Sequence, residues 1–409
     1  MSIWMYMNPR RKAAGKGADL SALSPSEAEV IRRFHSTFKE YNMTPLASLP
    51  HLASEIGLKH YFVKDESKRF GLNAFKVLGA SYAVGRFLAE KLGCPITDLS
   101  RDDLSSPEAR RIAASLTFVT TTDGNHGRGV AWTARELGCK AKVFMPRGSA
   151  QIRVDNILAE KAECAVTDMN YDETVRMCWK LAQENGWIMV QDTAWDGYEK
   201  IPTWIMQGYG TLALEALEQM KSMKSLPTHC LLQAGVGTFA GAVVGFLTAA
   251  LGKDAPKFII VEPHKTNCIY TSAVAADGRP HAVTGDLDTF MAGLACGEPS
   301  TISWGILRDY ATAYISCPDY IAANGMRILA APLKNDPAII SGESGAATTG
   351  IVQWLMQHPA ARAQRDALGL DKDSTVLIIS TEGNTAPEVY RNVVWFGHHP
   401  DEDILPRMI

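Results

Sequence analysis

Lys76 is the one charged residue in the segment 73–80, which reads NAFKVLGA and lies where a helix is expected to begin. Burial among apolar neighbours lowers the pKa of a lysine, and the neutral amine can then form a Schiff base with an aldehyde. A lysine whose ammonium group reaches the surface along an apolar stem is the commoner explanation for such a segment. The local sequence therefore permits Schiff-base chemistry at Lys76 without favouring it.

Two loops rich in glycine and polar residues each follow an expected strand and precede an expected helix. The segment 234–241, AGVGTFAG, can present backbone N–H groups and a helix N-terminus to a phosphate, although a tight turn explains it equally well. A dinucleotide-binding loop is a third alternative, because Glu262 ends the next strand where a ribose-binding acid would lie. The segment 120–127, TTTDGNHG, combines hydroxyls, amides and a carboxylate, which suits carboxylate binding. Helix capping accounts for only one residue of that group.

Three further polar segments lie at expected strand or helix ends. They read QDT at 191–193, SGESG at 341–345 and STEGNT at 380–385. Asp192 is a candidate general base, although a turn residue is the commoner explanation for a single aspartate. A helix cap and a plain loop are the alternatives for the other two segments.

These residues need a framework that brings strand ends together, and the chain alternates between expected strands and helices. A capping box at Ser24–Glu27 predicts the first helix, and the segment 197–210 reads as a linker that carries proline and glycine. The alternation predicts an α/β fold with parallel sheets, helices on both faces and ligands at the carboxyl ends of the strands. Strands are expected at 61–64, 116–120, 140–145, 164–167, 187–191, 230–233, 258–261, 314–316 and 376–380, and helices at 76–92, 151–161 and 172–185.

Composition narrows the class of protein. A chain of 409 residues exceeds what one core normally supports, so two domains are expected. The net charge of -3 comes from well-mixed acids and bases, which argues against nucleic acid or a membrane surface as partner and for a small molecule. No stretch approaches ~18 consecutive apolar residues, and the N-terminal segment reads as an exposed arm without the pattern of a secretory signal, so we expect a cytoplasmic protein. The eight cysteines lack zinc-site spacing, and no metal is expected.

Taken in order, the segments NAFKVLGA, TTDGNHG, AGVGTFAG, VEP, SGESGA and STEGNT resemble the fold-type II pyridoxal-phosphate enzymes, the tryptophan synthase β and threonine dehydratase superfamily. Within it the chain is most similar to the diaminopropionate ammonia-lyases, from about residue 45 onward. The resemblance implies two open, twisted, mostly parallel sheets flanked by helices. It also implies a cytoplasmic homodimer whose active site lies between a large domain, residues 1–88 and 200–409, and a small domain, residues 89–199.

The resemblance also assigns site residues. Lys76 would carry pyridoxal 5'-phosphate, Asn125 would meet its 3-hydroxyl group, and Ser380 or Thr381 would lie near the ring nitrogen. The x position of the Ser-x-Gly-Asn-His loop of dehydratases is here an acid, Asp123. The remaining expected cofactor contacts are Gly235, Val236, Gly237, Thr238, Gly241 and Glu343, and the expected substrate contacts are Thr121, Thr122, Asp123, Gly124 and His126.

The implied reaction is α,β-elimination of D- and L-2,3-diaminopropionate to pyruvate and ammonia, a carbon–nitrogen lyase activity. Asp192 would remove the Cα proton of the L-isomer and Asp123 that of the D-isomer. An ordinary aspartate, pKa ~3.9, is a poor base at neutral pH, so a raised pKa is expected at these positions. A serine/threonine dehydratase, a nicotinamide-binding oxidoreductase and an inactive ligand-sensing relative are the alternatives. The resemblance also raises a Cys268–Cys296 disulfide, which the sequence does not decide.

Overall fold

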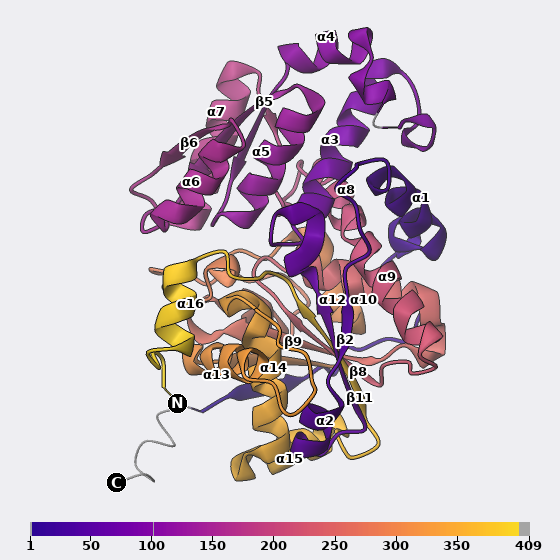
Figure 1. Ribbon diagram of the computed structural model, residues 1–409, viewed down its shortest axis with the longest axis vertical. Helices are drawn as coiled ribbons and strands as arrows, with labels where there is room; N and C mark the ends of the chain where they lie inside the picture. The colour runs from indigo at the N-terminus through magenta and orange to yellow at the C-terminus, as the bar shows by residue number, and fades with distance from the viewer. Residues whose placement is uncertain (1, 101, 401–409) are drawn as a thin grey trace.

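The computed structural model describes residues 2–100 and 102–400, which form two β-sheets with helices around them (Figure 1). The larger sheet has seven strands in the order β1-β10-β9-β8-β11-β3-β2, and the smaller has four in the order β6-β5-β4-β7. The strands of the larger sheet are β1 (Trp4–Met7), β2 (Leu46–Ser48), β3 (His60–Asp65), β8 (His229–Gln233), β9 (Lys257–Pro263), β10 (Ala313–Cys317) and β11 (Thr375–Ser380). Those of the smaller sheet are β4 (Thr117–Thr121), β5 (Lys140–Met145), β6 (Glu163–Val166) and β7 (Ile188–Met189).

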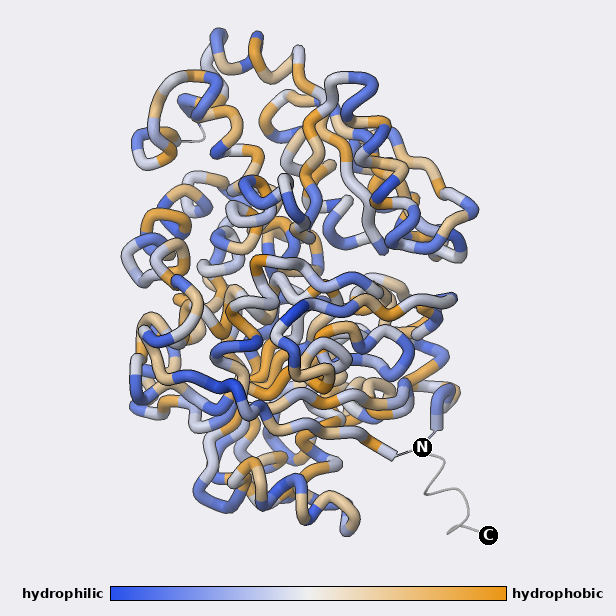
Figure 2. The backbone as a smooth tube through the Cα atoms, turned by 180° about the vertical axis from the view of Figure 1, so that it is seen from behind, coloured by the Kyte–Doolittle hydropathy of each residue, from blue (hydrophilic) through white to orange (hydrophobic). Residues whose placement is uncertain are grey.

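Within each sheet the inner strands pair in parallel, and only the edge strands β1 and β2 pair antiparallel. Strands β8, β10 and β11 are buried along their whole length, as expected for parallel strands with helices on both faces. Figure 2 shows this central part of the larger sheet as a block of hydrophobic backbone. The predicted α/β class with mostly parallel sheets is confirmed.

Helices surround both sheets, and α3 (Val77–Leu92) runs between them (Figure 1). It packs on α5 (Asn125–Leu137) beside the smaller sheet and on α8 (Lys200–Gly208) beside the larger one. Among the described residues, no helix has the length and apolar character needed to cross a membrane. The other helices are α1 (Pro25–His35), α2 (Pro50–Ile56), α4 (Pro107–Ser115), α6 (Gln151–Ala159), α7 (Tyr171–Asn185), α9 (Gly210–Ser222), α10 (Thr238–Leu251), α11 (Cys268–Ala275), α12 (Thr301–Tyr310), α13 (Asp319–Ala330), α14 (Glu343–Gln357), α15 (Arg362–Leu368) and α16 (Pro387–Val394).

The N-terminal segment corrects one prediction. We expected an exposed arm, but Trp4–Met7 forms β1, whose residues pair with Ala313–Ser316 at the edge of the larger sheet. Trp4 also lies over the His264 ring, with 4.2 Å between the ring centroids. The pairing joins residues about 300 positions apart, so no local pattern in the sequence could indicate it.

The expected linker at residues 197–210 is also wrong, because it contains α8. Pro202 lies in the first turn of this helix, where a missing backbone N–H costs no hydrogen bond. Gly208 lies against α3, and a Cβ there would come within 2.4 Å of the Leu78 carbonyl oxygen. The proline and the glycine that suggested a linker therefore belong to a tightly packed helix.

Candidate active site

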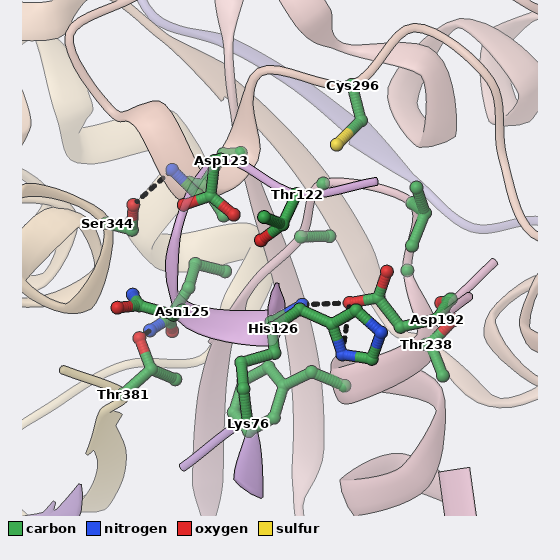
Figure 3. Close-up of a pocket in the computed structure, with 18 of the residues that line it drawn as sticks. Lys76, Thr122, Asp123, Asn125, His126, Asp192, Thr238, Cys296, Ser344 and Thr381 are labelled. Atoms are coloured by element: carbon green, nitrogen blue, oxygen red, sulfur yellow. Dashed lines mark hydrogen bonds and ion pairs between the residues drawn. The ribbon is translucent and has the colours of Figure 1, made fainter. Parts of the chain in front are cut away.

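A cavity of about 680 Å³ lies between the two sheets, at the carboxyl ends of strands β4, β8 and β11 (Figure 3). The segments predicted to carry chemistry supply most of its wall, together with the start of α10. Its lining residues are Phe75, Lys76, Thr121, Thr122, Asp123, Asn125, His126, Tyr171, Asp192, Gln233, Ala234, Gly235, Val236, Gly237, Thr238, Phe239, Ala240, Gly293, Leu294, Cys296, Ser344, Thr381 and Glu382. The structure therefore brings together strand ends that are up to 300 residues apart.

Lys76 directly precedes α3, and its side chain reaches into the cavity (Figure 3). Its Nζ donates a hydrogen bond to Asp192 Oδ2. Burial works to lower the pKa of Lys76, as predicted, but the adjacent Asp192 carboxylate outweighs it, so this pKa is raised above its ordinary value. The prediction of a lowered lysine pKa is therefore wrong for the free amine, because the sequence did not place a carboxylate beside it.

Asp192 is the buried partner of Lys76, with 3% of its surface exposed. Burial works to raise its pKa, but His126 and Lys76 lower it to about 2. The predicted raised pKa is therefore wrong while Lys76 carries a free ammonium group. The backbone carbonyl of Asp192 accepts a hydrogen bond from Thr238 at 2.6 Å, which ties this strand end to the start of α10.

His126 is fully enclosed, and burial is the first cause of its lowered pKa. Its Nε2 lies 2.8 Å from the Val190 carbonyl oxygen, and a carbonyl can only accept, so Nε2 carries the hydrogen. The other ring nitrogen, Nδ1, lies 3.9 Å from Asp192 Oδ2. His126 therefore packs against the Asp192 carboxylate as part of the cavity wall.

Asp123 lies on another side of the cavity from Asp192, next to Gly293 and Ser344 (Figure 3). The preceding residue, Thr122, holds the loop in shape, because its Oγ1 accepts from the backbone N–H groups of Gly124 and Gly127, each at 2.9 Å. The capping alternative thus applies to Thr122, whose hydroxyl hydrogen remains available to a ligand. Two carboxylates from different strand ends therefore face one cavity.

The glycine loop after β8 has the geometry of a phosphate site. Gly237 has a φ of +94°, and a Cβ there would lie 3.0 Å from Ser303 Oγ. Gly241 does not line the cavity; its lack of a side chain lets α10 approach α12, where a Cβ would lie 2.9 Å from Ser303 Cβ. The backbone of residues 235–238 opens the buried helix α10 and faces the cavity, as an anion-binding loop requires.

The other predicted contacts divide into cavity and framework residues. Thr381 lines the cavity and its Oγ1 accepts from Gln233 Nε2 at 2.9 Å, whereas Ser380 is turned away and bonds Ser341 Oγ at 2.8 Å. Glu343 and Gly124 do not line the cavity either. Glu343 lines a wider, adjoining cavity that shares Asp123 with the first.

The cavity also contains polar residues that sequence reasoning missed. Gln233 Oε1 and Glu382 Oε1 are buried and have no hydrogen-bond partner among the described residues. Asn125 donates to the other oxygen of Glu382. Buried polar atoms normally find partners, so these oxygens fit a polar ligand, and the lysine and phosphate loop fit pyridoxal phosphate. Glu382 lay in the segment STEGNT and could have been noticed, whereas Gln233 ends a strand and carries no signal.

Glu262 and the two candidate disulfide cysteines lie outside this chemistry. The Glu262 carboxylate accepts the backbone N–H groups of Ile269 and Tyr270 at 2.9 and 2.6 Å, and it is fully buried. It cannot reach a ribose, which removes the support for a dinucleotide-binding loop. Cys268 and Cys296 are both buried and both free thiols.

Comparison with known proteins gives consistent matches. The family model for pyridoxal-phosphate dependent enzymes matches residues 37–382. The chain is 53% identical to a diaminopropionate ammonia-lyase of Salmonella typhimurium over 97% of its own length and 98% of the relative's. The holo form of the Escherichia coli diaminopropionate ammonia-lyase superposes with a TM-score of 0.91 at 52% identity, covering 97% of this chain and 98% of the other. The complex of that enzyme with an aminoacrylate–PLP azomethine reaction intermediate superposes with a TM-score of 0.89 at 51% identity and the same coverage.

Proposed function

This chain belongs to the pyridoxal-phosphate dependent enzymes, and we propose that it converts 2,3-diaminopropionate to pyruvate and ammonia by α,β-elimination. The observation that carries the proposal is that two carboxylates, Asp123 and Asp192, line different sides of the cavity that holds Lys76 (Figure 3). The D- and L-isomers present the Cα hydrogen in opposite directions, so one base on each side serves both. The similarity to ammonia-lyases named for this substrate supports it.

The residues of the cavity divide the work. Bound pyridoxal phosphate supplies the electron sink for the charge that develops at Cα. Lys76 supplies the amine that carries it, and the backbone N–H groups of residues 235–238 hold the phosphate. Asn125 and Thr381 orient the ring from two sides. The loop at residues 121–126 receives the substrate carboxylate, and the surrounding buried wall excludes water.

The proton at Cα goes to a different carboxylate for each isomer. We assign Asp192 to the L-isomer and Asp123 to the D-isomer. Support comes from their separate surroundings, since Asp192 contacts Lys76 and His126 whereas Asp123 contacts Arg153. Removing one carboxylate should then leave the other half of the reaction intact.

The test compares Asp123→Asn and Asp192→Asn with the wild-type enzyme, by pyruvate release from each isomer. We expect Asp123→Asn to lose about 10²–10⁴ of D-isomer turnover, the usual contribution of a positioned base, while L-isomer turnover remains. Asp192→Asn should show the reverse. Asp286→Asn is the matched control, because this acid is exposed and pairs with Arg147 outside the inner cavity.

Two outcomes contradict the proposal. Equal loss of both isomers in Asp123→Asn would refute the assignment of one base to each side. Faster turnover of L-serine or L-threonine than of diaminopropionate by the wild-type enzyme would make the protein a dehydratase instead.

The surroundings of the enzyme are also proposed. We assign residues 1–88 and 200–409 to a large domain and 89–199 to a small one; residue 88 falls inside α3, so this helix would connect them. The eight free cysteines support a reducing, cytoplasmic compartment. The resemblance to this enzyme family supports a homodimer, which light scattering on the purified protein would test.

A further inference from the structure

Arg153 is a buried arginine that contacts acids from the surroundings of both sheets. It lies on α6, and its Nη1 donates to Asp123 Oδ2 at 3.1 Å and to the Asp123 carbonyl oxygen at 3.3 Å. Its Nη2 donates to Glu343 Oε1 at 2.5 Å. Asp123 follows a strand of the smaller sheet, whereas Glu343 begins α14, which packs on β8 and β11 of the larger sheet. The arginine therefore ties the loop that bears Asp123 to the larger sheet.

The Asp123 carboxylate depends on this arginine for its position. Among the residues that the structure describes, Arg153 is the one side chain that donates to it. The loop itself offers little restraint, because the next residue is Gly124, with a φ of +148°. A Cβ at this glycine would lie 2.9 Å from Arg153 Cδ, so the stem of the arginine also packs on the loop backbone. Both the head and the stem of Arg153 fix the Asp123 loop.

Asp192 is held by different groups. Lys76 donates to its carboxylate, Tyr171 Oη lies 3.5 Å from Oδ1, and Thr238 donates to its backbone carbonyl. None of these three is a hydrogen-bond partner of Arg153. The two candidate bases therefore have separate supports, and a change at Arg153 acts on Asp123 alone.

We propose that Arg153, anchored by Glu343, is the positioning residue for the D-isomer half of the reaction. It does not touch the reacting atoms; it holds Asp123 where the carboxylate can reach the Cα proton of the D-isomer. The inference rests on the proposed function, since it presumes that Asp123 acts on that isomer. It adds that selectivity between the isomers depends on a salt bridge behind the base as well as on the base itself.

The experiment measures kcat and KM for D- and L-2,3-diaminopropionate in Arg153→Met, Arg153→Lys and Glu343→Gln. We expect Arg153→Met to lower kcat for the D-isomer about 10²-fold, the usual effect of misplacing a reacting group by about 1 Å. KM for that isomer and both constants for the L-isomer should change little, because the base acts in the chemical step. Arg153→Lys should retain part of the D-isomer activity, since lysine keeps the charge but not the two-pronged geometry.

Glu343→Gln tests the same bridge with Arg153 intact, and it decides the question if Arg153→Met does not fold. It should lower the D-isomer kcat less than Arg153→Met does. Arg135→Met is the matched control, because Arg135 pairs with Glu160 close to α6 and lies outside the cavity. It should leave the ratio of D- to L-isomer turnover unchanged.

A second measurement does not depend on activity. The melting temperature of the cofactor-free protein, taken for Arg153→Met, Glu343→Gln and the double variant, should show coupling between the two residues. Additive losses would mean that the salt bridge does not form.

The possible results separate this inference from the proposed function. A wild-type enzyme that releases no pyruvate from either isomer would remove the proposed function and this inference with it. Turnover of both isomers by the wild type, with equal losses for D and L in the Arg153 variants, would refute the positioning role alone. A selective loss of D-isomer kcat supports it.

Discussion

Replacing Glu215 with glutamine should lower the free energy of unfolding by about 3–5 kcal/mol, the usual effect of breaking a buried ion pair. Glu215 belongs to a group of four ionised side chains, with Lys64, Glu66 and Arg69, whose side chains are all 0% exposed. Its carboxylate accepts from Lys64 Nζ at 2.8 Å and from Arg69 Nη2 at 2.7 Å. Two cations and two anions balance there, so a neutral glutamine leaves an uncompensated buried positive charge.

The pKa of Glu215 gives a second measure of this effect. Burial works to raise the pKa, but Arg69 and Lys64 lower it from 4.5 to about 2. A difference of about 2.5 between the unfolded and folded pKa values corresponds to about 3 kcal/mol, which agrees with the first figure. Because the folded pKa is the lower one, this stabilisation is complete above about pH 5 and is lost as the pH falls through 2. The difference between wild type and variant should therefore be largest near neutral pH and shrink in acid.

The assay is urea unfolding of the cofactor-free protein, with Glu218→Gln as the matched control. Glu218 lies on the same helix, but its ion pair with Arg32 is partly exposed, with side chains 40% and 25% exposed, so its loss should cost under about 1 kcal/mol. Adding Lys64→Met to Glu215→Gln removes the surplus charge and should cost less than Lys64→Met alone. The reasoning is refuted if Glu215→Gln costs no more than Glu218→Gln, or if Lys64→Met costs the same in both backgrounds.

Two further predictions concern other buried groups. Burial raises the pKa of Glu262 to about 8, so the folded protein holds this proton more tightly than the unfolded chain, and stability should fall as the pH rises from about 5 to 8; Glu262→Gln should flatten the melting temperature over this range, and parallel curves for the two proteins would contradict us. All eight cysteines are free thiols, so alkylation after unfolding without reductant should label eight sites by mass spectrometry, and a count of six would show a disulfide.

The inner strands and helix starts were predictable because their signals are local. The strand expected at 140–145 has these bounds in the structure, and Ser24 caps α1 by accepting the Glu27 backbone N–H, as the capping box indicated. The edge strand β1 was missed because its signal lies in a partner strand far along the chain. Helix α8 was missed because Pro202 and Gly208 read as breakers, although the sequence does not show that one lies in a first turn and the other against a neighbouring helix.

The site divides in the same way. Lys76, Asp123 and Asp192 were found because parallel strands bring their carboxyl ends, and the loops that follow, to one edge. Arg153 was missed because an arginine within a helix is ordinary in sequence, and its importance comes from the acids that the fold places around it. Motifs therefore identified the groups that face the ligand, whereas the groups behind them required the structure.

The charges of Lys76 and Asp192 cannot be understood separately. While Lys76 is an ammonium, it contributes to holding the pKa of Asp192 at about 2, and such a carboxylate is too weak a base to take a proton from Cα near neutral pH. Burial acts on Asp192 in the opposite direction, because it disfavours the charged form. Once the Lys76 nitrogen loses its positive charge, the burial of Asp192 is less opposed and its pKa rises. Asp192 is therefore held inactive by the same lysine whose neutralisation the chemistry requires, and Asp123, which has Arg153 as its partner, lacks this control.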